Sequence, residues 1–277
     1  MNAPDLRQQR DFSNVGIDEA LERAHSLIPF LRKHASANDS ATRLVPEVVQ
    51  AIHEAGLFRY LQPKRWGGME LDFVSYFDVP EVLARGDIST AWVVANLASH
   101  HRGLALWPEA AQEEIWGQSR DTLIASGIAF FQGTAKRVCG GLRLTGKWGF
   151  SSGVDHATWE QLACIVKNEA GAPVDWVMCQ VPLGDCQVID DWQTLGMRGT
   201  GSRTVVCDGV FVPGHRALSM HVAARSHAYP GLKLHANPMF KVPTPALGGH
   251  CIAGCVVGNA AAMLDLATQM VKERSTA

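Results

Sequence analysis

The spacing of apolar residues changes twice along this chain, and each change restricts the possible fold. Over the first 118 or so residues, apolar positions recur every three or four residues, as between Asp18 and His34. A similar segment ends at Gly56, a residue suited to a left-handed helix terminus, and Ser89 is positioned to cap a helix that runs to Leu106. We therefore expect a helical N-terminal region.

From Thr122 the pattern becomes that of strands. Short runs rich in Val, Ile, Trp and Cys alternate with Gly, Pro and Asp, which is typical of an antiparallel β domain. The expected strands are 134–139, 142–150, 159–167, 174–181 and 203–212, with a hairpin turn at 140–141.

A long helical segment returns at 246–271. It is apolar around most of its circumference, so it needs partners on several sides. Either other subunits cover it, or the chain is a shortened form of a longer protein.

Composition narrows the classes of partner. The chain is 47% hydrophobic with a formal net charge of -2, and its pI is about 6.6. Such a balance favours neither nucleic acid nor an anionic membrane surface. The polar start MNAPDLRQQRDF does not resemble a signal peptide, and no run of about 18 uninterrupted apolar residues occurs. We expect a cytoplasmic protein.

Cysteine usage points to neither a disulfide framework nor a metal site. There are seven cysteines, an odd number, and none forms a CxxC pair. We expect reduced and mostly buried thiols. Cys251 and Cys255 are four apart on the last helical segment, and simple packing is favoured over a metal or redox role.

Two segments carry polar groups suited to ligand binding. The glycine-rich GMRGTGSRTVVCDGVFVP places Arg198, Thr200 and Ser202 where the backbone can approach a ligand, although a hairpin turn with a solvated arginine explains it equally well. It is not a dinucleotide fingerprint, because no βαβ unit surrounds it. His100 and His101 end the segment STAWVVANLASHH, either to face a ligand or to complement the helix C-terminus.

Three segments together resemble one family. They are GLFRYLQPKRWGGMELDF, LTGKWGFSSGVDHATW and WQTLGMRGTGSRTVVCDGVFVP. The family is that of the acyl-CoA dehydrogenase-like flavoproteins, and within it the oxygenase components of two-component flavin monooxygenases, such as the p-hydroxyphenylacetate and hydroxylated-steroid hydroxylases. The resemblance covers roughly residues 20–275.

The resemblance implies an α+β fold in three parts. Residues 1–120 would form an N-terminal helical domain and 121–225 a central antiparallel β barrel. Residues 226–277 would supply a substrate-side loop and the first helix of a C-terminal bundle. In the family, the whole bundle completes the flavin pocket and the core of a homotetramer, and this chain has only its beginning.

The resemblance also implies a chemistry. Reduced FMN or FAD from a separate flavin reductase would react with molecular oxygen, and the resulting C4a-hydroperoxide would hydroxylate an aromatic, phenolic substrate. His100 would orient or deprotonate the phenol. The flavin-contacting residues would be Ser151, at flavin N5, with Phe150, Ser152, Arg198, Thr200 and Ser202. The substrate-binding residues would be His100, Ser126, Met239 and Phe240.

Other interpretations stay open. SSG at 151–153 can be only a polar turn, and Ser126 can be a strand-end hydroxyl that bonds the backbone. Trp66 fits core packing, and His156 can lie in a pocket or a turn. An acyl-CoA dehydrogenase or oxidase with bound FAD is a second function, disfavoured because no TEPxxGSD-like segment occurs. A shortened, non-catalytic member of the family is a third.

Overall fold

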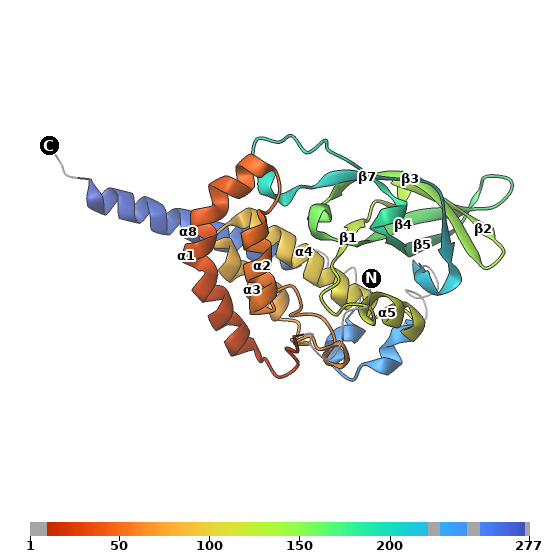
Figure 1. Cartoon of the computed structure of the whole chain (residues 1–277), viewed down its shortest axis with the longest axis horizontal. Helices are drawn as coiled ribbons and strands as arrows, with labels where there is room; N and C mark the ends of the chain where they lie inside the picture. Colours follow the sequence, from red (N-terminus) through yellow and green to blue (C-terminus); the bar gives the residue numbers. More distant parts are fainter. Residues whose placement is uncertain (1–9, 221–227, 243–249, 275–277) are drawn as a thin grey trace.

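A computed structural model describes residues 10–220, 228–242 and 250–274, and Figure 1 shows a helical part beside a β part. The helical part begins with five α-helices, close to where apolar spacing predicted them. They are α1 (Ile17–Ala41), α2 (Pro46–Ala55), α3 (Ser75–Ala84), α4 (Ile88–Leu104) and α5 (Glu109–Trp116). As expected, α2 ends at Gly56, whose φ of 76° is left-handed.

The N-cap of α4 is Asp87, so the prediction of Ser89 was wrong. The Asp87 carboxylate accepts hydrogen bonds from the backbone N–H groups of Ser89 and Thr90 at 3.2 and 3.1 Å. Asn38 of α1 donates to the same carboxylate at 3.0 Å. The cap therefore also joins α4 to the end of α1.

The β part is one eight-stranded sheet in the order β6-β7-β3-β2-β4-β5-β8, with β1 paired to β4. The strands are β1 (Ile124–Gly127), β2 (Gly133–Val138), β3 (Gly141–Ser151), β4 (Trp159–Lys167), β5 (Pro173–Pro182), β6 (Gln187–Ile189), β7 (Arg203–Pro213) and β8 (Ala217–Ser219). The five strands expected from sequence are present, and Gly140 (φ 80°) makes the expected turn.

The expectation of a wholly antiparallel barrel needs correction in two respects. β1 and β2 both pair with β4 in parallel, so the sheet is mixed. Among the described residues, β6 and β8 remain edges of the sheet, so the barrel is not closed by a ladder. β1, β6 and β8 were missed because segments of three or four residues give too few positions to show alternation.

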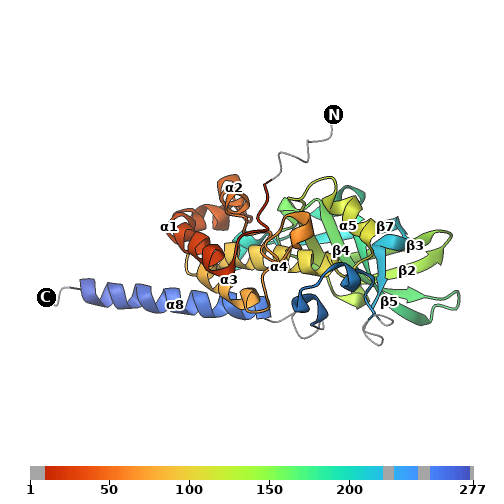
Figure 2. The same ribbon diagram turned by 90° about the horizontal axis from the view of Figure 1, so that it is seen from below.

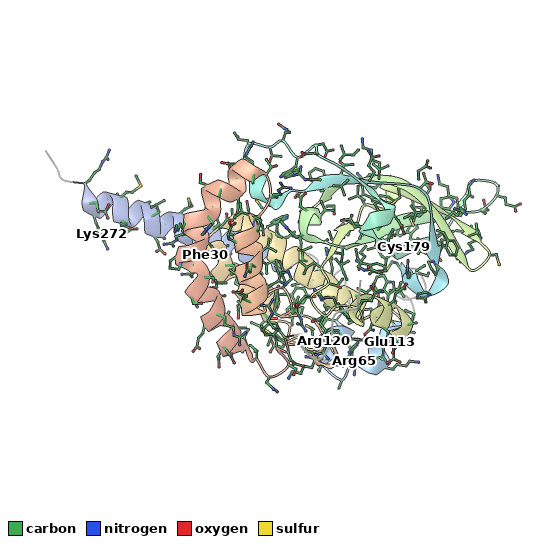
Figure 3. The ribbon with its side chains drawn as sticks, viewed as in Figure 1. Phe30, Arg65, Glu113, Arg120, Cys179 and Lys272 are labelled. Atoms are coloured by element: carbon green, nitrogen blue, oxygen red, sulfur yellow. The ribbon has the colours of Figure 1, made fainter. Side chains whose placement is uncertain are left out.

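Two apolar cores stabilise these parts. The larger is shared by the helices and the sheet face that contacts them, and the smaller lies inside the curved sheet. Trp148, Leu162 and Cys179 belong to the smaller core, and Figure 3 shows Cys179 within the β part. Six described cysteines are free thiols, four of them buried, as expected; the side chain of Cys251 lies outside the described residues.

Helix α8 (His250–Glu273) runs along α3 and then beyond the rest of the molecule, with Lys272 near its free end (Figures 2 and 3). Gly254 and Gly258 allow the close approach, because a Cβ at either position would overlap the carbonyl oxygen of Phe77 or Glu81 of α3. Beyond this contact Leu264, at 69% exposure, is among several apolar side chains that face solvent.

Helix α8 is also the one candidate membrane span among the described residues. Its stretch Ile252–Glu273 is long enough to cross a bilayer and has a mean hydropathy of 1.2. A helix that packs into a bundle has the same composition, and the contact with α3 buries one of its faces.

Replacing Gly258 by Ala tests the packing of α8 on α3. Alanine is the better helix former by about 1 kcal/mol, so a net loss must come from the overlap with Glu81. We expect a free energy of unfolding lower by about 1–3 kcal/mol, measured by urea denaturation. The control is Gly184→Ala, where an added Cβ meets nothing within 4 Å. Equal stability of the two variants would show that α8 does not pack against α3 in solution.

Candidate functional site

Helix α4 brings the helical part and the sheet together. Most of its residues are buried, and its half-buried residues include Trp92, Asn96 and Ser99, spaced three and four apart so that they share one face. The Trp92 indole N–H donates to the hydroxyl of Ser152 at 3.1 Å, so this face meets the end of β3.

A β-bulge decides how the segment WGFSSG is presented. Trp148 pairs with Val205 of β7 and Ser151 pairs with Arg203, so β3 contains one residue more than β7 in this stretch. Phe150 takes a left-handed backbone (φ 65°), and the residue is 73% exposed. As a result Ser151 points into the interior of the sheet, as Trp148 does, and is fully buried.

Of the two serines, Ser152 carries the hydroxyl that faces α4. The Ser151 hydroxyl donates to Glu160 at 2.7 Å inside the sheet, whereas Ser152 is half-buried between Trp92 and Ser202. In this conformation Ser151 therefore exposes no surface through which its side chain could make the predicted contact with flavin N5. The geometry favours the adjacent Ser152 for a contact with flavin N5, and the flavin contacts of both serines stay predictions.

Thr200, Ser152 and Ser202 form a chain of hydroxyl groups, named here the hydroxyl cluster. The Ser152 and Ser202 hydroxyls lie 2.7 Å apart, as do those of Ser202 and Thr200. The Thr200 hydroxyl is also 2.9 Å from the carbonyl oxygen of Met197, which can only accept.

One direction satisfies all these contacts. Trp92 donates to Ser152, Ser152 to Ser202, Ser202 to Thr200, and Thr200 to the Met197 carbonyl. The reverse direction would place two acceptors against each other at Met197. In the favoured direction the Ser152 hydroxyl proton is used within the cluster. A ligand beside Ser152 therefore meets an oxygen that accepts a hydrogen bond.

The arginines at this end of β7 are bound within the protein. Arg198 bonds the backbone carbonyls of Asp39 and Thr194 at 3.1 and 3.3 Å. Arg203 is buried and donates to both carboxylate oxygens of Asp155 at 2.9 Å. The predicted cofactor contact of Arg198 stays a prediction, because the side chain is 34% exposed and its guanidinium already has partners.

His100 is held as a neutral imidazole. Its Nδ1 lies 2.7 Å from the carbonyl oxygen of Ile124 in β1, so Nδ1 carries the proton and donates, and Nε2 is left as an acceptor. Burial lowers the pKa of His100 to about 4. The imidazole can thus accept a hydrogen bond from a phenol, but it is too weak a base to deprotonate one at neutral pH.

Ser126 is half-buried on β1, beside Gln161 of β4 in the parallel register. It is two residues from the carbonyl that holds His100, so these two predicted substrate residues lie on adjoining elements. Met239 and Phe240 are instead buried in the larger core, at 3% and 1% exposure. Buried Arg102 of α4 donates to both of their carbonyl oxygens. Their predicted contact with substrate stays a prediction.

Glu160 is a site residue that sequence reasoning missed. It lies on β4 beside the Ser151 hydroxyl, and none of its surface is exposed. Burial raises its pKa to about 8, so the carboxyl is protonated at neutral pH. Alternation along WEQLACIV could have revealed it, because Glu160 shares the inward positions of Leu162, Cys164 and Val166.

A cavity of about 630 Å³ lies elsewhere, beside α2. Its lining includes Arg43, His53, Asp155 and His156 but none of the predicted flavin- or substrate-contacting residues. His156 lies in the short 3-10 turn Val154–His156, and its place in the flavin or substrate pocket stays a prediction. Trp66 packs against the larger core, as expected, and donates from its indole to Gln112 at 3.1 Å.

Comparisons with known proteins agree on one family. Residues 26–117 match the family of the acyl-CoA dehydrogenase N-terminal domain. Over 245 residues the chain is 37% identical to the flavin-dependent monooxygenase oxygenase subunit HsaA of Rhodococcus jostii (strain RHA1), covering 88% of this chain and 63% of that protein. It is 32% identical over 256 residues to the oxygenase component of an FADH(2)-dependent resorcinol hydroxylase from Rhizobium sp. (strain MTP-10005), covering 92% and 62%.

A solved structure agrees with these matches. The crystal structure of 3-HSA hydroxylase from Rhodococcus sp. RHA1 superposes with a TM-score of 0.88 at 35% identity, covering 93% of this chain and 67% of that one. The chain spans slightly less than two thirds of the length of the two curated relatives above.

The protonation state of His100 can be tested by NMR titration. Because its folded-state pKa is lowered to about 4, the resonances of its ring should not titrate as the pH falls from 7 to about 5. The lowered pKa also makes the free energy of unfolding depend on pH. The contribution of neutral His100 is fully present above the ordinary pKa of 6.5 and is lost as the pH falls through the folded-state pKa of about 4, because the unfolded state takes up the proton first. Comparison with His100→Gln assigns the resonances. Titration of His100 near its ordinary pKa would contradict the burial and the bond to Ile124.

Proposed function

Because the chain belongs to the acyl-CoA dehydrogenase-like family of flavin-dependent monooxygenase oxygenase subunits, we propose that it hydroxylates an aromatic, phenolic substrate with reduced FMN or FAD and molecular oxygen. The observation that carries the proposal is the hydroxyl cluster at the end of β3, where Ser152 presents an accepting oxygen. The ring N5–H of a reduced flavin is a donor and would complement that oxygen.

The surroundings of the hydroxyl cluster fit a flat aromatic group with a polar edge. Phe150 is largely exposed, and its ring meets Trp192 edge-on at 5.9 Å. Leu195, in the same loop as Trp192, is fully exposed. The Trp192 indole N–H donates to the Met197 carbonyl that also accepts from Thr200, so this aromatic pair adjoins the hydroxyl cluster. An aromatic surface next to polar groups would suit an isoalloxazine ring. When bound, the reduced flavin would supply the oxygen-activating chemistry.

The residues on α4 and β1 would hold the substrate. The free Nε2 of neutral His100 would accept the hydrogen bond of a phenol hydroxyl, and Ser126 would provide a second polar contact. A phenol held by a neutral imidazole keeps its proton until the reaction, so His100 would orient the ring rather than ionise it. This refines the base role considered from sequence.

The proposal extends to partners and location. A separate flavin reductase would supply the reduced flavin, as the two-component relatives imply. Assembly as a homotetramer would cover the apolar side chains that α8 exposes. We also propose a cytoplasmic location.

A turnover assay tests the proposed reaction. The purified chain, reduced FMN or FAD and oxygen should convert at least one member of a panel of phenols to a hydroxylated product detected by mass spectrometry. Free reduced flavin without protein is the control for uncatalysed chemistry. Release of hydrogen peroxide alone, with every phenol tested, would contradict the proposal and favour the non-catalytic alternative.

Replacing Thr200 by Val tests the direction of the hydroxyl cluster. The variant keeps the shape of the side chain but removes the donor to Met197, so Ser152 is no longer fixed as an acceptor. We expect binding of reduced FMN to weaken about fivefold to tenfold, measured by anaerobic titration. The matched control is Thr194→Val in the same loop, whose hydroxyl bonds Gly196 away from the cluster. Equal affinities of the two variants would show that the cluster does not contact the flavin.

A further inference from the structure

Glu160 occupies an unusual position for a carboxyl group. It lies at one end of the interior of the curved sheet, on the inward side of β4, with an apolar core beyond it. One oxygen, Oε1, accepts from the Ser151 hydroxyl at 2.7 Å, and the other, Oε2, has no hydrogen-bond partner among the described residues. A charged carboxylate with a single hydrogen bond would be costly to bury there.

In the part of the chain that the structure describes, no nearby charge stabilises an ionised Glu160. The titratable groups inside the sheet are thiols, and bonds to neighbouring thiols together with burial raise the pKa of Cys179 and Cys186 and keep them neutral. On β7, Arg203 pairs in register with Ser151, but its guanidinium binds Asp155 and Asp190. β1 carries no titratable side chain. Burial accordingly raises the pKa of Glu160 to about 8.

The bond between Glu160 and Ser151 fixes the bulge from its inner side. Three consecutive residues leave the strand in different directions: Phe150 faces solvent, Ser151 faces Glu160, and Ser152 faces Trp92. Phe150 has a left-handed backbone, which non-glycine residues adopt at a cost, so the conformation needs support on both sides. The hydroxyl cluster supplies one side and Glu160 the other.

We infer that Glu160, as a neutral acid, is a positioning residue that anchors Ser151 and thereby aims Ser152 at the bound flavin. The inference rests on the proposed function for the identity of the ligand, and it assigns the anchor to a residue that touches neither flavin nor substrate. Ionisation of Glu160 would place a charge without a counter-ion inside the sheet. The single bond from Ser151 does not offset the lost hydration of that charge, so the sheet would open at the bulge to admit water.

The first test is the pH dependence of reduced-FMN binding. Wild-type affinity should fall by about tenfold per pH unit above about 8, where Glu160 ionises. Glu160→Gln keeps a neutral hydrogen-bonding group of the same shape, so it should bind as the wild type does below that pH and not show the fall. The control is Glu169→Gln, an exposed glutamate of the same domain, which should keep the wild-type profile. Identical profiles for wild type and Glu160→Gln would overturn the inference.

A partner variant separates this role from simple structural support. The bond from Ser151 lowers the pKa of Glu160, against the larger effect of burial. Ser151→Ala removes the anchored hydroxyl, so binding of reduced FMN should weaken below pH 8 as well, and the remaining fall in affinity should move to higher pH. A merely destabilising change would not shift the fall in that direction. If the fall in reduced-FMN affinity stays at the same pH or moves to lower pH in Ser151→Ala, the hydrogen bond between Ser151 and Glu160 is contradicted.

Infrared spectroscopy tests Glu160 without any flavin. Difference spectra between about pH 6 and about pH 10 should contain the carbonyl band of a protonated carboxyl group that is absent from Glu160→Gln. If this band is present but neither the wild type nor any variant binds reduced flavin, the proposed function is refuted, whereas the conclusion that Glu160 is a buried neutral acid is kept. Absence of the band would overturn the inference whatever the flavin binding.

Discussion

The burial of α4 on nearly every side is the constraint on which the rest of the structure depends. Its start is fixed to α1 through Asp87 and Asn38, and its end reaches β1 through His100 and the 238–242 segment through Arg102. Between them Trp92 meets the end of β3. Buried polar side chains need partners with good geometry, so these bonds hold the helical part in one register against the sheet. The candidate site lies where that register brings α4, β1 and β3 together.

One extra residue in β3 gives the neighbouring residues Ser151 and Ser152 different surroundings and different hydrogen-bond partners. Regular alternation from Trp148 would send Ser151 out of the sheet, and the bulge turns it inward. Ser151 then bonds a buried acid, while Ser152 joins a row of hydroxyls that ends at a backbone carbonyl. The two sides of the bulge support each other, because loss of either would leave the left-handed Phe150 uncompensated.

Residue patterns in the sequence predicted much of the fold but only part of the candidate site. Helical spacing, the stop at Gly56 and the strand runs predicted most elements, since these signals are local. The three shortest strands and the parallel pairing with β4 were missed, because pairing partners distant in sequence leave no local pattern. Ser126, Ser152 and His100 lie on adjoining elements, but Met239 and Phe240 are buried in the core, which their loop-like, proline-rich surroundings did not reveal.

The sequence by itself determined the order of helical and β regions, the family, and the set of residue types from which a flavin site can be built. These follow from local periodicity and from motifs that short segments contain in full. Tertiary structure alone decided which hydroxyl faces α4, which nitrogen of His100 is free, and that Glu160 is a neutral acid. Each of these depends on what surrounds a group in space: a bulge, a carbonyl on another strand, or the exclusion of water, none of which is a property of the residue itself.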